Sequence, residues 1–135
     1  MALVCIFSFW RGRRTERTVA AVLLVAWVAS AAVQNRRLVH HGAQWAIFAI
    51  DLGFMLFLLA MMWRNKEKWL IWAFAYQLVL VLIHIASWLN LAISQWDFFT
   101  GYYIFSLLVL GALGVGAAVA RRPPPAPLPP RTQSA

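Results

Sequence analysis

Residues 44–63 read QWAIFAIDLGFMLFLLAMMW, and Asp51 is the only charged residue in this apolar run. As a helix the run would rise about 30 Å, which matches the thickness of the hydrocarbon core of a bilayer. Three further apolar runs occupy residues 18–33, 69–91 and 99–120, and none of the four contains proline. The sequence therefore predicts an all-α integral membrane protein, built as an antiparallel bundle of four transmembrane helices.

The composition of the whole chain agrees with a lipid environment and excludes several other classes of protein. Of the 135 residues, 63% are hydrophobic and 12% are charged, whereas soluble domains are about 45–50% apolar and about 25% charged. A chain of this size cannot enclose so much apolar surface in a water-soluble fold. The single cysteine, Cys5, also excludes a disulfide-linked scaffold.

The distribution of positive charge predicts the orientation of the helices. Ten of the twelve Lys and Arg residues lie in the N-terminal segment, in the connector 64–68 and in the C-terminal tail, which share one side of a four-helix bundle. Because such residues concentrate on the cytoplasmic side, both termini are predicted to be cytoplasmic. The basic clusters are short and separated by apolar runs, so the net charge of +8 predicts no nucleic-acid partner. The abundance of Ala, Arg and Pro favours a bacterial source and hence the bacterial inner membrane.

Two short segments flank the predicted transmembrane domain of residues 18–120. Residues 1–17 begin with an apolar stretch that is too short to span a bilayer, so we expect a cytoplasmic interfacial segment. Residues 121–135 carry all six prolines, which predicts a basic, disordered cytoplasmic tail with polyproline II character. Pro-x-x-Pro spacings would suit a partner with an aromatic groove, and a stiff solvated spacer is the alternative. The prolines concerned are Pro123, Pro124, Pro127 and Pro130.

Polar residues inside the spans are the candidates for a functional site, because ionisable groups in a bilayer are costly and need partners. Asp51 and His84 each lie seven residues from the predicted outer ends of their helices, so they share one depth. Ser106 reaches that depth from the last span, and Gln77 shares a helix face with His84. The sequence thus predicts a buried polar layer of these four residues, which either joins helices or handles a proton or cation.

The same layer contains residue types that are used in hydrolases and in metal sites. Ser106 lacks both the Gly-x-Ser-x-Gly elbow and donors for an oxyanion hole, so we expect no catalytic residues. No metal site is predicted, and haem would require two copies of His84 from the two chains of a dimer. We therefore expect a protein without a cofactor.

Small residues mark the places where helices are expected to pack closely. Ala112, Gly116 and Ala120 recur at four-residue spacing in the last span, and Gly53 lies beside Asp51 in the second. Such small side chains allow the backbones of neighbouring helices to approach each other. The small face of the last span is expected to pack either within its own bundle or against a second copy of the chain.

These features favour a non-enzymatic protein that acts as an accessory or structural subunit of a membrane assembly. One alternative is a homo-oligomeric channel or a proton or cation transporter that uses Asp51 and His84. In size, basic tail and number of spans the chain resembles a phage holin, which implies an oligomeric pore. An intramembrane enzyme is the third alternative. The expected partners are bilayer lipids and either further copies of the chain or other membrane proteins.

Overall fold

The computed structural model describes residues 2–35, 42–89 and 95–120, which are almost entirely helical. They form five helices, which are α1 (Ala2–Arg11), α2 (Arg14–Asn35), α3 (Gly42–Arg64), α4 (Lys68–Trp88) and α5 (Gln95–Val119). The predicted tail of residues 121–135, with its four candidate prolines, lies outside the described residues.

Four of these helices are long and apolar enough to cross a membrane, which confirms the number of spans predicted from the sequence. The spans cover Arg14–Val33, Trp45–Arg64, Lys68–Trp88 and Phe99–Val119. The first differs most from its predicted bounds, because helix α2 begins at Arg14 and not at residue 18. Its first turn contains Glu16. The four helices indicate a multi-pass membrane protein.

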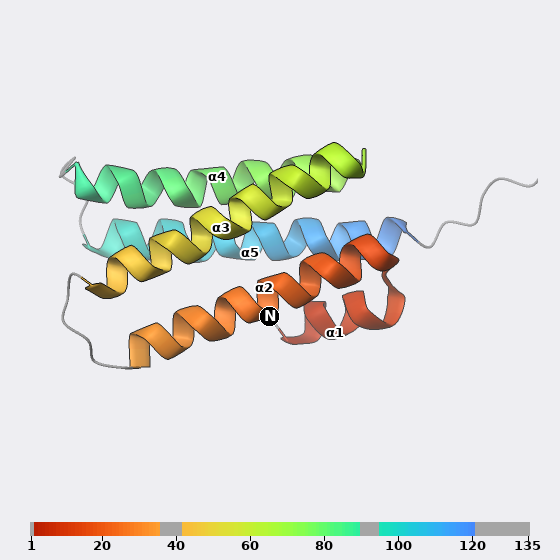
Figure 1. The fold of residues 1–135 in the computed structure, drawn as a ribbon, viewed down its shortest axis with the longest axis horizontal. Helices are drawn as coiled ribbons and strands as arrows, with labels where there is room; N and C mark the ends of the chain where they lie inside the picture. The colour runs from red at the N-terminus through yellow and green to blue at the C-terminus, as the bar shows by residue number, and fades with distance from the viewer. Residues whose placement is uncertain (1, 36–41, 90–94, 121–135) are drawn as a thin grey trace, which may run out of the picture.

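The four long helices lie side by side along the long axis of the molecule (Figure 1). One end of the molecule gathers the start of α2, the end of α3, the start of α4 and the end of α5. At this end α2 begins with Arg14, α3 ends with Arg64 and α4 begins with Lys68. We therefore call it the basic end. Residues that are far apart in the sequence therefore meet at this end.

A core of apolar side chains fills the half of the bundle next to the basic end. Leu58, Leu70 and Leu113 are fully buried at its centre, one from each of α3, α4 and α5. Its other members come from the same helices and from α2: Val19, Ala20, Leu23, Phe54, Trp69, Ala73, Val109 and Leu110. Many large apolar side chains on the outer faces are exposed instead, as expected where the surrounding solvent is lipid.

Helix α1 lies against α2 and α5 near the basic end (Figure 1). Cys5 and Ser8 are buried in this contact, and Val4 packs against the apolar core. Gly12 directly follows α1, and its N–H donates to the Ser8 carbonyl oxygen at 2.8 Å. A Cβ atom at Gly12 would lie 2.5 Å from that oxygen, so the turn into α2 requires glycine. The N-terminal segment is thus a helix docked on the bundle.

Cys5 is expected to react slowly with a maleimide while the protein is folded. Its side chain is 1% exposed, and burial raises the pKa of the Cys5 thiol, which lowers the fraction of reactive thiolate. The rate of the maleimide reaction with Cys5 should therefore keep rising with pH across the alkaline range. This rate should also increase strongly when SDS unfolds the protein. Leu3→Cys in a Cys5→Ser background is the control, because Leu3 is 82% exposed on the same helix. Equal rates at both positions would contradict the docking of α1.

Candidate functional site

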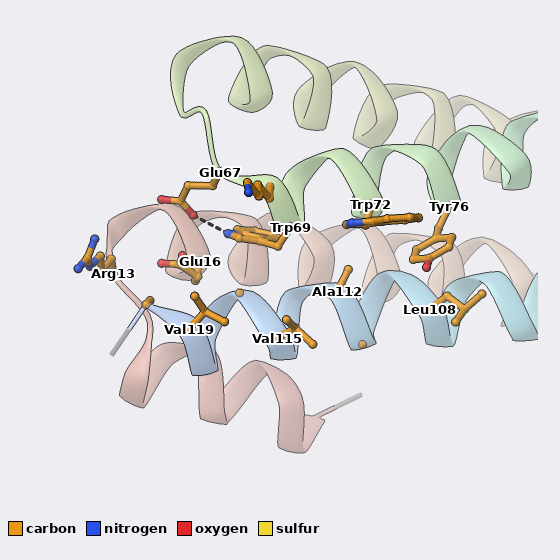
Figure 2. A pocket seen from close by; sticks show the side chains of 14 residues that line it. Arg13, Glu16, Glu67, Trp69, Trp72, Tyr76, Leu108, Ala112, Val115 and Val119 are labelled. Carbon is orange, nitrogen blue, oxygen red and sulfur yellow. Dashed lines mark hydrogen bonds between the residues drawn. The ribbon is translucent and has the colours of Figure 1, made fainter. Parts of the chain in front are cut away.

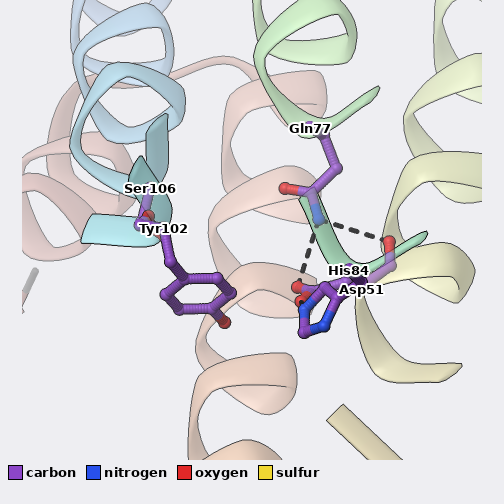
Figure 3. A network of polar contacts seen from close by, with 5 residues as sticks. All are labelled: Asp51, Gln77, His84, Tyr102 and Ser106. Atoms are coloured by element: carbon purple, nitrogen blue, oxygen red, sulfur yellow. Dashed lines mark hydrogen bonds and ion pairs between the residues drawn. The ribbon is translucent and has the colours of Figure 1, made fainter. Parts of the chain in front are cut away.

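Three buried side chains from α3 and α4 form a polar network near the middle of the bundle (Figure 3). The Gln77 amide donates to the Asp51 carboxylate oxygen Oδ1 and to the Asp51 backbone carbonyl oxygen, both at 3.2 Å. The ring nitrogen Nε2 of His84 lies 3.1 Å from the other carboxylate oxygen, Oδ2. Both oxygens of the Asp51 carboxylate are therefore bonded to side chains of α4.

Helical geometry explains why one carboxylate meets two residues of the same neighbouring helix. Gln77 and His84 are seven residues apart, which is about two helical turns, so their side chains share a face of α4. Both are buried, with exposed fractions of 2% and 4%. Asp51 lies between them on α3 and joins the two helices at a level where lipid offers no polar partner. The structure thus brings together three of the four residues expected in the polar layer.

Tyr102 of α5 extends the network toward a third helix, and the sequence analysis did not single it out. Its hydroxyl points toward the Asp51 carboxylate (Figure 3) and interacts with it. The Tyr102 ring meets the edge of the His84 ring with centroids 5.8 Å apart, and Phe48 approaches His84 at 6.0 Å. One signal was available, because Tyr102 lies one turn before Ser106 on α5.

Ser106 shares the depth of the network but its hydroxyl is used differently. The Ser106 Oγ donates to the backbone carbonyl oxygen of Tyr102 at 2.7 Å, within its own helix. Such a bond satisfies a serine in a membrane helix without a partner on another helix. A nucleophilic role would require this hydroxyl to face a base instead, so the geometry of Ser106 gives no support to the alternative of an intramembrane enzyme.

A cavity of about 430 Å³ lies beside the network, between α2 and α5. Asp51, Gln77 and Ser106 supply polar atoms to its wall, and Trp27 and Ser30 of α2 line the opposite side. The Asp51 side chain is 12% exposed, compared with 4% for His84. The carboxylate is therefore the ionisable group of the pair that a small polar species in this cavity would meet first.

The candidate packing glycines behave differently from one another. A Cβ atom at Gly53 would meet no atom within 4 Å, so no helix in the described part of the chain packs closely against Gly53. The reason is the rotation of α3, which turns Gly53 outward. Gly116 is buried instead, and a Cβ atom there would lie 2.6 Å from the ring of Trp69. Ala112 and Ala120, on the same face as Gly116, are half-buried.

Metal or haem binding would involve the same residues. Within residues 2–35, 42–89 and 95–120 no group of three His, Cys, Asp or Glu side chains is placed to hold a metal ion. Either ring nitrogen of His84 could ligate haem iron. One of them, Nε2, faces Asp51. Haem binding by two copies of His84 would therefore require the ring to use its other nitrogen or to leave Asp51.

A second group of polar side chains at the basic end was missed by the sequence analysis. Glu16 of α2 is 1% exposed, and neither of its carboxylate oxygens has a hydrogen-bond partner among the described residues. Glu67, directly before α4, accepts a hydrogen bond from the indole nitrogen of Trp69. The two carboxylates lie close enough to interact electrostatically.

Comparison with known proteins adds no family to this description, since no family model, curated protein or solved structure matches the chain.

Proposed function

We propose that the chain is a non-enzymatic inner-membrane protein of bacteria, folded as an antiparallel bundle of four spans with both termini in the cytoplasm. Support comes from the basic end, where Arg14, Arg64 and Lys68 stand at the ends of three different spans. Positive residues at span ends are retained on the cytoplasmic side. The basic end is therefore the cytoplasmic end of this proposal.

The proposed topology predicts that a cysteine placed at Lys66, between α3 and α4, is labelled only from the cytoplasm. Lys66 is exposed, so its accessibility depends on the side of the membrane and not on folding. Spheroplasts treated with an impermeant maleimide should leave Lys66→Cys unlabelled until the membrane is permeabilised, in a Cys5→Ser background. Labelling of intact spheroplasts would reverse the orientation.

Within the membrane we propose that the chain acts as a structural subunit of a larger assembly. The observation that carries this proposal is the Asp51 carboxylate, whose two oxygens are occupied by Gln77 and His84 of the same chain. A polar network satisfied in this way stabilises the contact between two helices. The apolar core around Leu58 and Leu113 lies in the other half of the bundle, next to the basic end.

Trp27 is the best candidate for the contact with a partner subunit. It lies within the α2 span and is 53% exposed, whereas tryptophan in membrane proteins concentrates near the interfaces. Tryptophan is also enriched among the residues that contribute most to binding. The exposed α2 face near Trp27 includes Val28, which is 58% exposed.

This proposal is tested by native mass spectrometry of the full chain, which is extracted from its native membrane into nanodiscs. We expect a complex with a fixed number of chains, and Trp27→Ala should shift it toward the free chain. Trp63→Ala is the matched control, because Trp63 is 81% exposed but lies at the end of its span. A single chain without partners under these conditions would overturn the subunit role.

The cavity beside Asp51 favours a second candidate function, which is the binding and passage of a proton or small cation in an oligomer. Ionisable residues in membrane spans commonly mark ion pathways, and Asp51 lines a cavity of about 430 Å³. Proteoliposomes with a pH-sensitive dye would reveal this activity as proton flux. Flux should be lost in Asp51→Asn and retained in Asp51→Glu. The absence of flux in the unmodified protein would eliminate this candidate and leave the subunit role intact.

A further inference from the structure

A cavity of about 740 Å³ lies between α2, α4 and α5, outside the Asp51 network (Figure 2). It begins at the basic end, where four charged residues line it, and continues between α4 and α5 along apolar and aromatic side chains. The charged residues are Arg13, Glu16, Glu67 and Lys68. The cavity therefore has a polar end at the membrane boundary and an apolar body within the span.

Glu16 is the group in this cavity that lacks a partner. Its side chain is 1% exposed, and both of its oxygens are without a hydrogen-bond donor among the described residues. A buried carboxylate without donors is strongly destabilised. Glu67 interacts electrostatically with Glu16, and its own carboxylate accepts the hydrogen bond from Trp69 (Figure 2). A cationic group with N–H donors would stabilise both carboxylates in their charged forms.

The charges around the polar end restrict the kind of molecule that would fit. The two carboxylates of Glu16 and Glu67 are balanced by Arg13 and Lys68, which also line the cavity and are exposed. A simple cation would use only the acids, and an anion only the bases. A zwitterion with an ammonium and a phosphate group would satisfy both pairs, since Arg and Lys both bind phosphate.

The apolar body of the cavity has the length of one leaflet of a bilayer. It is lined on α5 from Leu108 to Val119, which are eleven residues apart and so span about 16 Å along the helix axis. Half of the hydrocarbon core of a bilayer is about 15 Å. Trp72 and Tyr76 of α4 form the facing wall (Figure 2). An acyl chain that starts at the membrane boundary would lie along this wall.

We propose that the cavity is a binding site for a phospholipid with a primary ammonium headgroup, taken from the leaflet at the basic end. The ammonium donates to Glu16 and Glu67, the phosphate is held by Arg13 and Lys68, and one acyl chain lies between α4 and α5. A choline headgroup has no N–H to donate, and a glycerol headgroup has no positive charge. Phosphatidylethanolamine is the lipid with this chemistry that the test uses.

The full chain is reconstituted with equal amounts of phosphatidylethanolamine, phosphatidylcholine and phosphatidylglycerol, and the retained lipids are counted by native mass spectrometry. We expect about tenfold enrichment of phosphatidylethanolamine over phosphatidylcholine, the ratio that corresponds to one charge-assisted hydrogen bond. Glu16→Gln should reduce this ratio to about one because it removes the negative charge. Equal retention of the lipids by the unmodified protein, or preference for phosphatidylglycerol, would overturn the proposal.

A second pair of variants keeps the test valid if Glu16→Gln fails to fold. Gly111 lines the cavity and Gly53 does not, yet a Cβ atom at either glycine would meet no atom within 4 Å. Gly111→Leu should therefore fill the acyl-chain position without disturbing the bundle and abolish the enrichment. Gly53→Leu should retain it. Unchanged enrichment in Gly111→Leu would place the lipid elsewhere and overturn the proposal.

Discussion

Replacement of Gly116 by leucine is expected to destabilise the bundle by about 3 kcal/mol, the upper end of the usual cost of overpacking. Gly116 is buried, and a Cβ atom there would lie 2.6 Å from Cδ2 and 2.7 Å from Cε2 of Trp69. These atoms belong to the fused part of the indole ring, which cannot move away without displacing the whole side chain. Trp69 is itself 8% exposed and bonded to Glu67, so it has little room to shift.

The measurement is the free energy of unfolding in mixed micelles with increasing SDS. Gly111→Leu is the matched control on the same helix, because a Cβ atom at Gly111 would meet no atom within 4 Å. This control should be neutral or slightly stabilising, since leucine has a higher helix propensity than glycine. Equal destabilisation by the two variants would contradict the packing of α5 against Trp69.

Removal of either partner of the Asp51–His84 pair is expected to destabilise the protein by about 3 kcal/mol, because the remaining polar group stays buried without its partner. The two side chains are 3.1 Å apart, and each also contacts other parts of the network. Asp51→Asn weakens the acceptor that both α4 side chains use, and His84→Gln removes the ring that faces it. Unfolding in mixed micelles measures both effects.

The double variant separates the pair from the rest of the network. In double-mutant cycles, hydrogen bonds between membrane helices have coupling free energies of about 0.6 kcal/mol on average and about 1.7 kcal/mol at most. We expect a coupling near the upper value, because both oxygens of Asp51 are engaged and the site is buried. A coupling of zero in the double-mutant cycle would mean that the two residues do not interact in the membrane.

The existence and number of the spans could be read from the sequence because they depend on local composition. A run such as residues 44–63 is apolar over the thickness of a bilayer whatever surrounds it. The common depth of Asp51 and His84 also followed from the sequence, since the rise of a helix is constant and both residues lie seven positions from a predicted span end. Counting along the chain was enough for both conclusions.

Contacts between residues that are distant in the sequence needed the tertiary structure. Glu16 and Glu67 belong to two different basic segments, and nothing in either segment indicates that their carboxylates meet beside Trp69. The interaction of Tyr102 with Asp51 likewise joins α5 to α3. Sequence spacing describes positions within one helix and carries no information about the distance to the next.

Helix rotation is the remaining property that only the tertiary structure decided. Gly53 and Gly116 are equivalent as sequence signals, yet Gly53 faces outward and Gly116 faces Trp69. In a soluble protein the apolar face of a helix would reveal its inner side, because the outer side is polar. In a membrane both sides are apolar, since lipid is as apolar as the protein core. Steric fit and a few hydrogen bonds therefore choose the rotation, and these exist only once the helices are packed.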